Sequence, residues 1–159
     1  MLTIAARAPD HGKLAPWRFV IVADQRDALA DLLQQALAEE NPDATDAHRR
    51  KEEEFAHHAG QLVVLVSAPI EDHKIPVWEQ QLSCGAAAMS LLIAAPALGY
   101  VAGWVTGWRA YSPRVAAAFC GPGERIAGFV FIGRPARPLE ERQRPKLSEV
   151  VRTWSPPTV

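Results

Sequence analysis

The sequence predicts one three-layer domain of the α/β or α+β class, because apolar strand-like segments alternate with helix-like segments along the chain. Its 159 residues suit a single domain with a substantial core. Segments rich in β-branched and aromatic residues predict four buried strands, at residues 17–23, 62–68, 100–107 and 125–133. Periodicity alone does not fix the directions of these strands, so both classes of sheet stay open at this point.

The segments between the predicted strands carry helical signals. Asp24 is a candidate N-cap for a helix with an apolar stripe through Leu29, Leu33 and Leu37. A long helix over residues 77–95 is rich in small side chains, and we expect it to pack closely against another helix. A short helix should begin at Ser112, with the following proline in its first position.

Residues 46–58 form a predicted helix that is rich in charge and poor in apolar side chains. Such charge runs are typical of a helix face that is exposed to solvent. The alternative is a mobile flap over a binding site, which would extend over residues 41–58. The sequence leaves both interpretations open.

The segment 134–159 contains five prolines and shows no clear element of its own. We therefore predict a single domain over residues 1–159, in which residues 134–159 are a C-terminal extension that reaches a partner subunit. From Arg134 to Arg152 the segment has six cations and three anions, a local net charge of +3. One interpretation of this excess of positive charge is that it keeps the segment soluble. The other is that its arginine side chains form a site for a phosphate or a carboxylate.

The composition excludes several classes of protein. The formal net charge of −1 gives no general attraction to nucleic acid or to an anionic membrane. No apolar run reaches the roughly 18 residues of a membrane span, and the first residues lack the layout of a signal peptide. Two cysteines suit a reducing compartment. We expect a cytoplasmic protein that binds neither nucleic acid nor membrane.

Common motifs of catalysis are missing from the sequence. Residues 11–13 lack the context of a phosphate-binding P-loop, and no strand is followed by Gly-x-Gly-x-x-Gly. The histidines are scattered along the chain, so we expect no metal site. Cys84 lies in an alanine-rich helix and should be inert. Cys120 precedes a glycine-rich turn and leaves a thiol-dependent hydrolase as a remote alternative.

The stretch RAPDHGKLAPWRF, residues 7–19, places charge, proline and glycine directly before the first predicted strand. Arg7, His11 and Lys13 offer three cationic or hydrogen-bonding groups within seven residues. A rigid polar loop at the end of a strand is a common place for ligand contacts. The residues thus predict a ligand-binding loop, with a plain helix–strand connection as the alternative.

This stretch also resembles the first signature of the FMN-dependent nitroreductase family, in its small single-domain branch of NAD(P)H nitroreductases. Further similar segments follow in the expected order, at residues 72–100, 103–107, 112–119 and 125–135. The resemblance implies an α+β fold in three layers, with a central, mostly antiparallel sheet flanked by helices. It also implies an intertwined homodimer with two FMN molecules at its interface, the small-residue helix in the dimer core and the C-terminal extension across the partner.

The resemblance further implies which residues meet the cofactors. Arg7 and His11 match family positions that contact FMN from the first loop, and Lys13 stands where many relatives have Asn or Ser. The other implied contacts are Trp104, Val105 and Thr106 in a strand segment that lines FMN, Arg142 and Arg144 at the phosphate, and Ala94 near the nicotinamide.

The activity implied by the resemblance is that of an FMN-dependent oxidoreductase. NADH or NADPH would reduce nitroaromatic, quinone or similar electron-poor acceptors by ping-pong hydride transfer. No protein acid or base is required, because the flavin carries the chemistry. Relatives begin with a helix carrying Arg-Arg-Ser that grips the FMN phosphate, and this sequence starts after it. The alternative is therefore a flavin-binding or scaffold homologue with weak or no catalysis.

Overall fold

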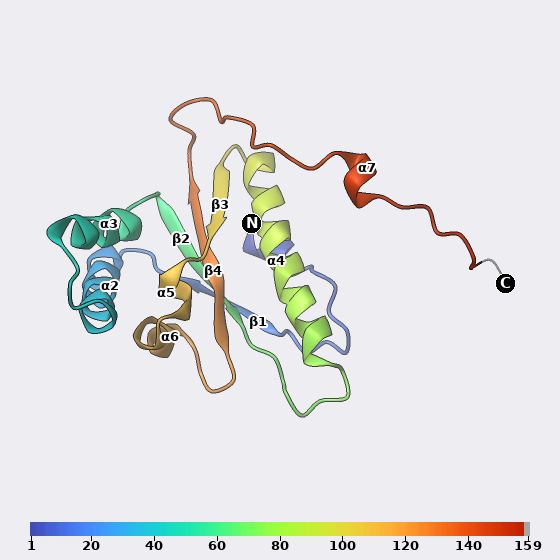
Figure 1. Ribbon diagram of the computed structural model, residues 1–159, viewed down its shortest axis with the longest axis horizontal. Helices are drawn as coiled ribbons and strands as arrows, with labels where there is room; N and C mark the ends of the chain where they lie inside the picture. Colours follow the sequence, from blue (N-terminus) through green and yellow to red (C-terminus); the bar gives the residue numbers. More distant parts are fainter. Residues whose placement is uncertain (158–159) are drawn as a thin grey trace.

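The computed structural model describes residues 1–157, and its centre is a four-stranded sheet (Figure 1). The strands lie in the order β1-β2-β4-β3, and each neighbouring pair is antiparallel. Their bounds are β1 (Trp17–Ile21), β2 (Gln61–Ser67), β3 (Val101–Val105) and β4 (Arg125–Gly133). All four predicted strands are confirmed, and their directions agree with the antiparallel sheet that the resemblance implied.

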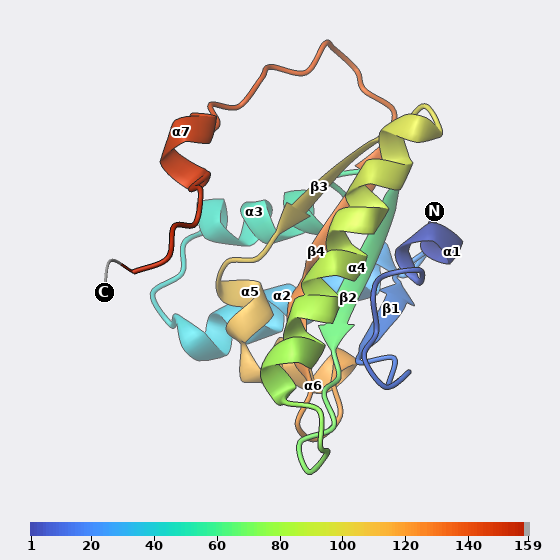
Figure 2. The ribbon, with the colours of Figure 1, turned by 90° about the vertical axis from the view of Figure 1, so that its right-hand side faces the viewer.

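Helices cover both faces of the sheet and complete the three predicted layers (Figures 1 and 2). One face carries α2 (Arg26–Glu40), α3 (Asp46–Ala56), α5 (Trp108–Tyr111) and α6 (Pro113–Phe119). The other face carries α1 (Leu2–Ala5) and α4 (Val77–Ala97). The fold is therefore α+β, as predicted.

The core lies on both sides of the central strands, because successive side chains of a strand point to opposite faces. On the α2–α3 side, Phe129 and Phe131 of β4 pack into one cluster. On the α4 side, Val130 and Ile132 pack with Leu91 of the helix. Burial on both faces explains the continuous apolar runs that predicted these strands from the sequence.

A bulge interrupts the pairing of β4 with β2. Leu65 pairs with Gly128 and Val66 pairs with Ile126, so Ala127 is an extra residue on β4. The bulge turns the Ala127 carbonyl toward β3, where the indole N–H of Trp104 donates a hydrogen bond to it at 3.1 Å. The indole thus lies directly over Gly128.

The small side chains of α4 face the sheet. Cys84, Ala87 and Ala88 pack against Trp17 and Leu65. Small residues let the helix backbone approach the strands closely, and this contact accounts for the composition of the helix. Within residues 1–157, α4 also packs against the short helix α1, where Ala5 and Leu91 share one cluster. The expected close contact with a helix of a second copy stays a prediction.

The outer side of α4 is apolar and exposed. Trp78, Leu82, Gly85, Met89 and Ile93 repeat at helical spacing, and we call this surface the α4 stripe. Trp78 is 66% exposed and Ile93 is 59% exposed, while a Cβ on Gly85 would have nothing within 4 Å. Apolar surface of this kind typically marks an interface. No helix within residues 1–157 is long and apolar enough to cross a membrane.

The start of α2 differs from the prediction. The helix begins at Arg26 with Gln25 as its N-cap residue, and no side chain caps it. Asp24 lies one position too early, because Ala23 turns the chain with a φ of 48° before the helix begins. The predicted cap at Ser112 is confirmed, since its hydroxyl accepts the hydrogen bond of the Val115 backbone N–H at the start of α6.

The chain leaves the sheet after Gly133 and runs away from the body as an extended tail (Figures 1 and 2). One short helix, α7 (Leu147–Val150), interrupts the tail, and the sequence did not predict it. The apolar side chains of the tail are exposed, and Trp154 is 80% exposed. The predicted extension 134–159 is described as far as residue 157, and its last two residues lie outside the described part.

Candidate functional site

The loop between α1 and β1, residues 7–16, is held in shape by one of its own side chains. The Asp10 carboxylate accepts hydrogen bonds from the backbone N–H of Leu14 at 3.0 Å and of Ala15 at 2.8 Å. These bonds accompany a φ of 57° at Lys13 and of 47° at Ala15, in the left-handed region that most residues avoid. The chain itself therefore fixes the conformation of this loop.

The loop lies against the first turn of α4. His11 Nδ1 is 2.7 Å from Glu79 Oε2, which anchors the middle of the loop to the helix. Arg7 and Lys13 are exposed, and neither belongs to an ion pair within residues 1–157. Two of the three predicted contact residues thus offer unpaired cations at the surface, and the third is held by a carboxylate.

Strand β3 divides the predicted flavin-lining residues between two faces of the sheet. Trp104 pairs with Val130, whose side chain packs on the α4 side. Val105 pairs with Phe129, whose side chain packs on the α2–α3 side. Since β3 is an edge strand, a flat ligand can reach both side chains only around the exposed edge of the sheet.

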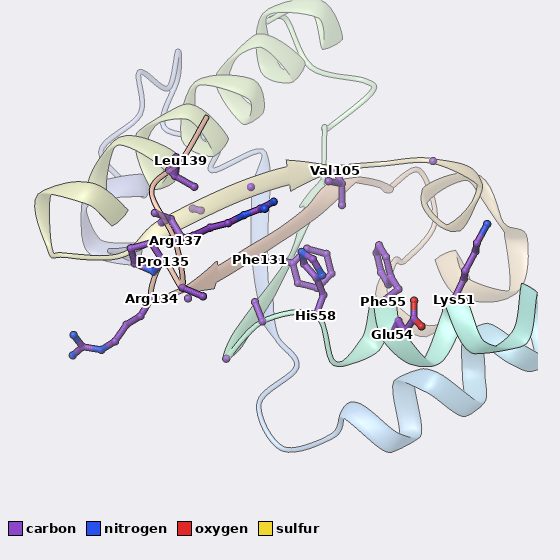
Figure 3. Close-up of a pocket in the computed structure, with 18 of the residues that line it drawn as sticks. Lys51, Glu54, Phe55, His58, Val105, Phe131, Arg134, Pro135, Arg137 and Leu139 are labelled. Atoms are coloured by element: carbon purple, nitrogen blue, oxygen red, sulfur yellow. The ribbon is translucent and has the colours of Figure 1, made fainter. Parts of the chain in front are cut away.

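A cavity of about 1000 Å³ lies beside β3 on the α3 side, and we call it the β3 cavity (Figure 3). Its walls come from α3, β3, the end of β4 and the first residues of the tail. The rings of Phe55 and His58 lie with their centroids 5.0 and 5.1 Å from that of Phe131. Val105 and Thr106, two of the predicted flavin contacts, line the same cavity.

An ion pair between the buried Glu52 and the largely buried Arg109, whose side chain is 16% exposed, lies at the Arg109 end of the β3 cavity. The Arg109 guanidinium binds both carboxylate oxygens of Glu52, with Nε–Oε2 at 2.5 Å and Nη2–Oε1 at 2.7 Å, and lies 4.0 Å from the centre of the Phe55 ring. Glu52 is 3% exposed, and no other charged side chain of residues 1–157 is buried. The pair ties α3 to α5 and to the turn at residues 106–107 that precedes α5.

The inner face of α3 therefore differs from a fully solvated helix, which was one of the two interpretations of its charge. Glu52 and Phe55 hold it to the rest of the fold, and only its outer face is exposed. The sequence reasoning missed Glu52 because it lies within a run of charged residues. The helical spacing of Glu52 and Phe55, on the side of the buried Ala56, was the signal that could have separated the two faces.

The remaining predicted contacts lie apart from the first loop. Arg142 and Arg144 are exposed in the tail, which leaves the sheet beside the C-terminal end of α4, whereas the first loop lies at its N-terminal end (Figure 1). A helix of 21 residues is about 30 Å long. One chain thus does not bring the first loop and the tail arginines together. Ala94 is 2% exposed and can influence a ligand only through the packing of α4.

Both cysteines are free thiols with raised pKa values. Burial raises the pKa of Cys84 to about 11, so this thiol is uncharged at neutral pH. Partial burial, and then the nearby Glu124 carboxylate, raise the pKa of Cys120. A nucleophilic cysteine needs the opposite shift. The environment of Cys120 therefore offers no support for the thiol-dependent hydrolase.

An exposed cluster joins the start of α2 to the end of α3. His57 Nε2 lies 3.0 Å from Asp27 Oδ1, and His57 Nδ1 lies 3.0 Å from the Glu53 carbonyl and 3.4 Å from Glu53 Oε1. The three side chains are close enough to be considered as metal ligands. However, the two carboxylates approach opposite ring nitrogens, an arrangement that suits a protonated imidazole. The hydrogen bonds to the Glu53 carbonyl and to Asp27 raise the pKa of His57.

This cluster is expected to make stability depend on pH. The pKa of His57 is higher in the folded protein than its ordinary value of 6.5. The protonated side chain therefore stabilises the fold fully below pH 6.5, and this stabilisation is lost as the pH rises through the pKa of the folded state. The measurement is the thermal midpoint of the parent protein and of His57→Gln at about pH 6 and about pH 9. The difference between the two proteins should shrink at the higher pH. An equal difference at both would contradict a role for the imidazolium charge.

Comparison with known proteins agrees with this fold and with the sequence signatures. The Nitroreductase family model matches residues 1–134. The chain belongs to the nitroreductase family. It is 34% identical over 137 residues to the "Putative NAD(P)H nitroreductase YdjA" of Escherichia coli (strain K12). The aligned residues make up 85% of this chain and 74% of that protein.

Solved structures show the same nitroreductase fold. The nitroreductase-like family protein of Bacillus cereus has a TM-score of 0.77 and 20% identity, covering 96% of this chain and 80% of that one. A Bacteroides fragilis nitroreductase with bound FMN has a TM-score of 0.63 and 22% identity, and the match covers 91% of this chain and 80% of that one. These structures show the fold, whereas the family match and the Escherichia coli relative confirm the predicted family and its oxidoreductase class. The individual contact residues and the assembly stay predictions.

Proposed function

We propose that this nitroreductase-family protein is an FMN-dependent oxidoreductase that uses NADH or NADPH to reduce an electron-poor acceptor, such as a nitroaromatic or a quinone. The observation that carries the proposal is the family match over residues 1–134, supported by the FMN-bound relative of the same fold. When bound, FMN supplies the hydride chemistry. The task of the chain is then to hold, orient and shield the cofactor.

The exposed edge of β3 suits a flat cofactor. A Cβ on Gly103 or Gly107 would have nothing within 4 Å, so the backbone there is open to a ring laid against it. As an edge strand, β3 also has backbone groups on one side without a strand partner. Thr106 adds a hydroxyl at the same place. These features support the proposed contacts of Trp104, Val105 and Thr106 with the flavin.

The cations of the first loop and of the tail suit the anionic part of FMN. We assign Arg142 and Arg144 to the phosphate, because a guanidinium can bind two phosphate oxygens at once. Arg7, His11 and Lys13 would contact the cofactor from the first loop. Because the loop and the start of the tail lie at opposite ends of α4, we propose that each site is shared between two chains.

A homodimer would also cover the apolar surfaces that one chain leaves exposed. The α4 stripe presents large side chains around Gly85, where another helix could approach closely. The tail extends away from the body with Leu147, Val150 and Trp154 exposed. We propose that two copies pack through the α4 stripe and that each tail crosses the other copy.

The test is titration of the purified protein with FMN, followed by flavin fluorescence, together with NADH and NADPH oxidation and a mass measurement in solution. We expect a dimer that binds FMN and oxidises a nicotinamide. Arg144→Gln should weaken FMN binding about tenfold, since one charge-assisted contact is lost. Arg152→Gln, in the same tail, is the matched control. Failure to bind FMN and to oxidise either nicotinamide would contradict the proposal, and binding without turnover would favour the scaffold homologue.

A further inference from the structure

The β3 cavity combines an aromatic wall with a cationic rim. We propose that it binds a planar aromatic ligand carrying a negative charge, such as an aromatic carboxylate or sulfonate, and that such compounds are the preferred acceptors. The binding step stands on the cavity alone. The use of the ligand as an acceptor rests on the function proposed above.

The wall of the cavity is made of rings that contact one another edge to face. Phe55 meets Phe129 and Phe131 edge to face, with interplanar angles of 86° and 85°. His58 meets Phe131 in the same way, at 77°. Rings packed in this manner offer an apolar surface to another aromatic ring. A volume of about 1000 Å³ is sufficient for a ligand of one or two rings.

The charges around the cavity are mostly positive. Its lining includes one carboxylate, Glu54, and four cations, Lys51, Arg109, Arg134 and Arg137. Two of these cations have other partners: Arg109 is paired with Glu52, and the Arg134 guanidinium lies 5.3 Å from the centre of the Tyr100 ring. The cations left for a ligand are therefore Lys51 and Arg137.

Arg137 is placed to hold the charged group of the ligand. Within residues 1–157, neither Arg137 nor Lys51 belongs to an ion pair. Figure 3 shows the Arg137 side chain extending along β3 toward Val105, whereas Lys51 lies at the far end, on the same helix as Glu54. The Glu54 charge partly offsets that of Lys51. A ring seated by Phe131 and His58 would thus direct its anionic substituent toward Arg137.

The cavity shares Val105 and Thr106 with the proposed flavin-lining segment. Thr106 and Gly107 line it, and Gly107 has open space where a Cβ would be. A ligand in the cavity would therefore lie beside the edge of β3 against which we place the flavin ring. This proximity is the reason for assigning the aromatic anion as an acceptor.

The test compares 4-nitrobenzoate with 4-nitrobenzamide, which has the same ring system without the charge. Binding to the FMN-treated protein is measured by calorimetry, and turnover by nicotinamide oxidation. We expect 4-nitrobenzoate to bind about tenfold more tightly, as one charge-assisted contact predicts. Arg137→Gln should remove this preference and raise KM for 4-nitrobenzoate with little change in kcat. Arg125→Gln, an exposed arginine outside the cavity, is the matched control.

The outcomes separate this inference from the proposed function. Equal binding of the two probes, binding of neither, or a preference that survives Arg137→Gln would overturn the inference even if FMN and nicotinamide support turnover. A charge preference in binding that is lost in Arg137→Gln would support the anion site even if the protein turned over no nicotinamide. That last result would count against the proposed oxidoreductase alone.

Discussion

Replacement of Gly128 by alanine is expected to lower the free energy of unfolding by about 3 kcal/mol, as for severe overpacking of a core. A Cβ at Gly128 would collide with the Trp104 indole, lying 2.5 Å from Cδ1, and would be 2.9 Å from the Val105 carbonyl oxygen. The indole can rotate away only by giving up its hydrogen bond to Ala127, whereas the carbonyl belongs to the backbone of β3. Urea denaturation followed by circular dichroism measures the loss.

Gly103→Ala is the matched control for this substitution. It adds the same methyl group on the neighbouring strand, where a Cβ would meet nothing within 4 Å. Its effect should stay within about 0.5 kcal/mol. Trp104→Ala in the Gly128→Ala background should recover part of the loss, because it removes the colliding ring. Equal effects of the two glycine substitutions would contradict the importance of the bulge.

Removal of the Glu52 carboxylate is expected to have an effect of similar size. Glu52→Ala should cost about 3 kcal/mol, because it leaves the Arg109 guanidinium without its partner at the end of the β3 cavity. Glu52→Gln should cost less, since the amide oxygen can still accept one hydrogen bond. The loss should appear in urea denaturation and, because α5 follows the turn at residues 106–107, as weaker FMN binding.

Glu39→Ala provides a matched control on an exposed pair. Glu39 Oε1 lies 2.5 Å from Arg114 Nη1, but the two side chains are 57% and 40% exposed. Solvent screening should keep its cost below about 1 kcal/mol. Replacing both Glu52 and Arg109 by apolar residues should be less harmful than replacing Glu52 alone. If Glu52→Ala lowered the free energy of unfolding no more than Glu39→Ala, burial would not increase the contribution of the Glu52–Arg109 pair to stability.

The sequence predicted the regular elements well, because each has a local signal. The four strands are apolar runs, and Ser112 caps α6 directly before a proline. The short helices α5 and α7 gave no such signal, because each is shorter than two helical turns. The start of α2 was misplaced because Asp24 has the chemistry of a cap, while the turn at Ala23 has no sequence signature.

The candidate site was only partly predictable, because most of it depends on distant contacts. Glu52 and Arg109 are far apart in the sequence, and nothing local distinguishes either residue from a surface charge. The β3 cavity is built from four separate segments. The Val105–Thr106 stretch was predicted as a flavin contact, whereas α3 and the tail had a functional role only as one of two open interpretations. Sequence spacing also gave no indication that the first loop and the tail lie at opposite ends of α4.

The hydrogen bonds of the Asp10 carboxylate within the first loop affect the free energy of binding a partner there. Both carboxylate oxygens hold the backbone of the first loop, and two of its residues are kept in a conformation that a free chain rarely visits. A partner that meets Arg7 and Lys13 therefore does not have to order the loop backbone, and the conformational entropy for that ordering is lost when the protein folds. The ordered loop therefore lowers the stability of the folded protein slightly and favours association with a partner.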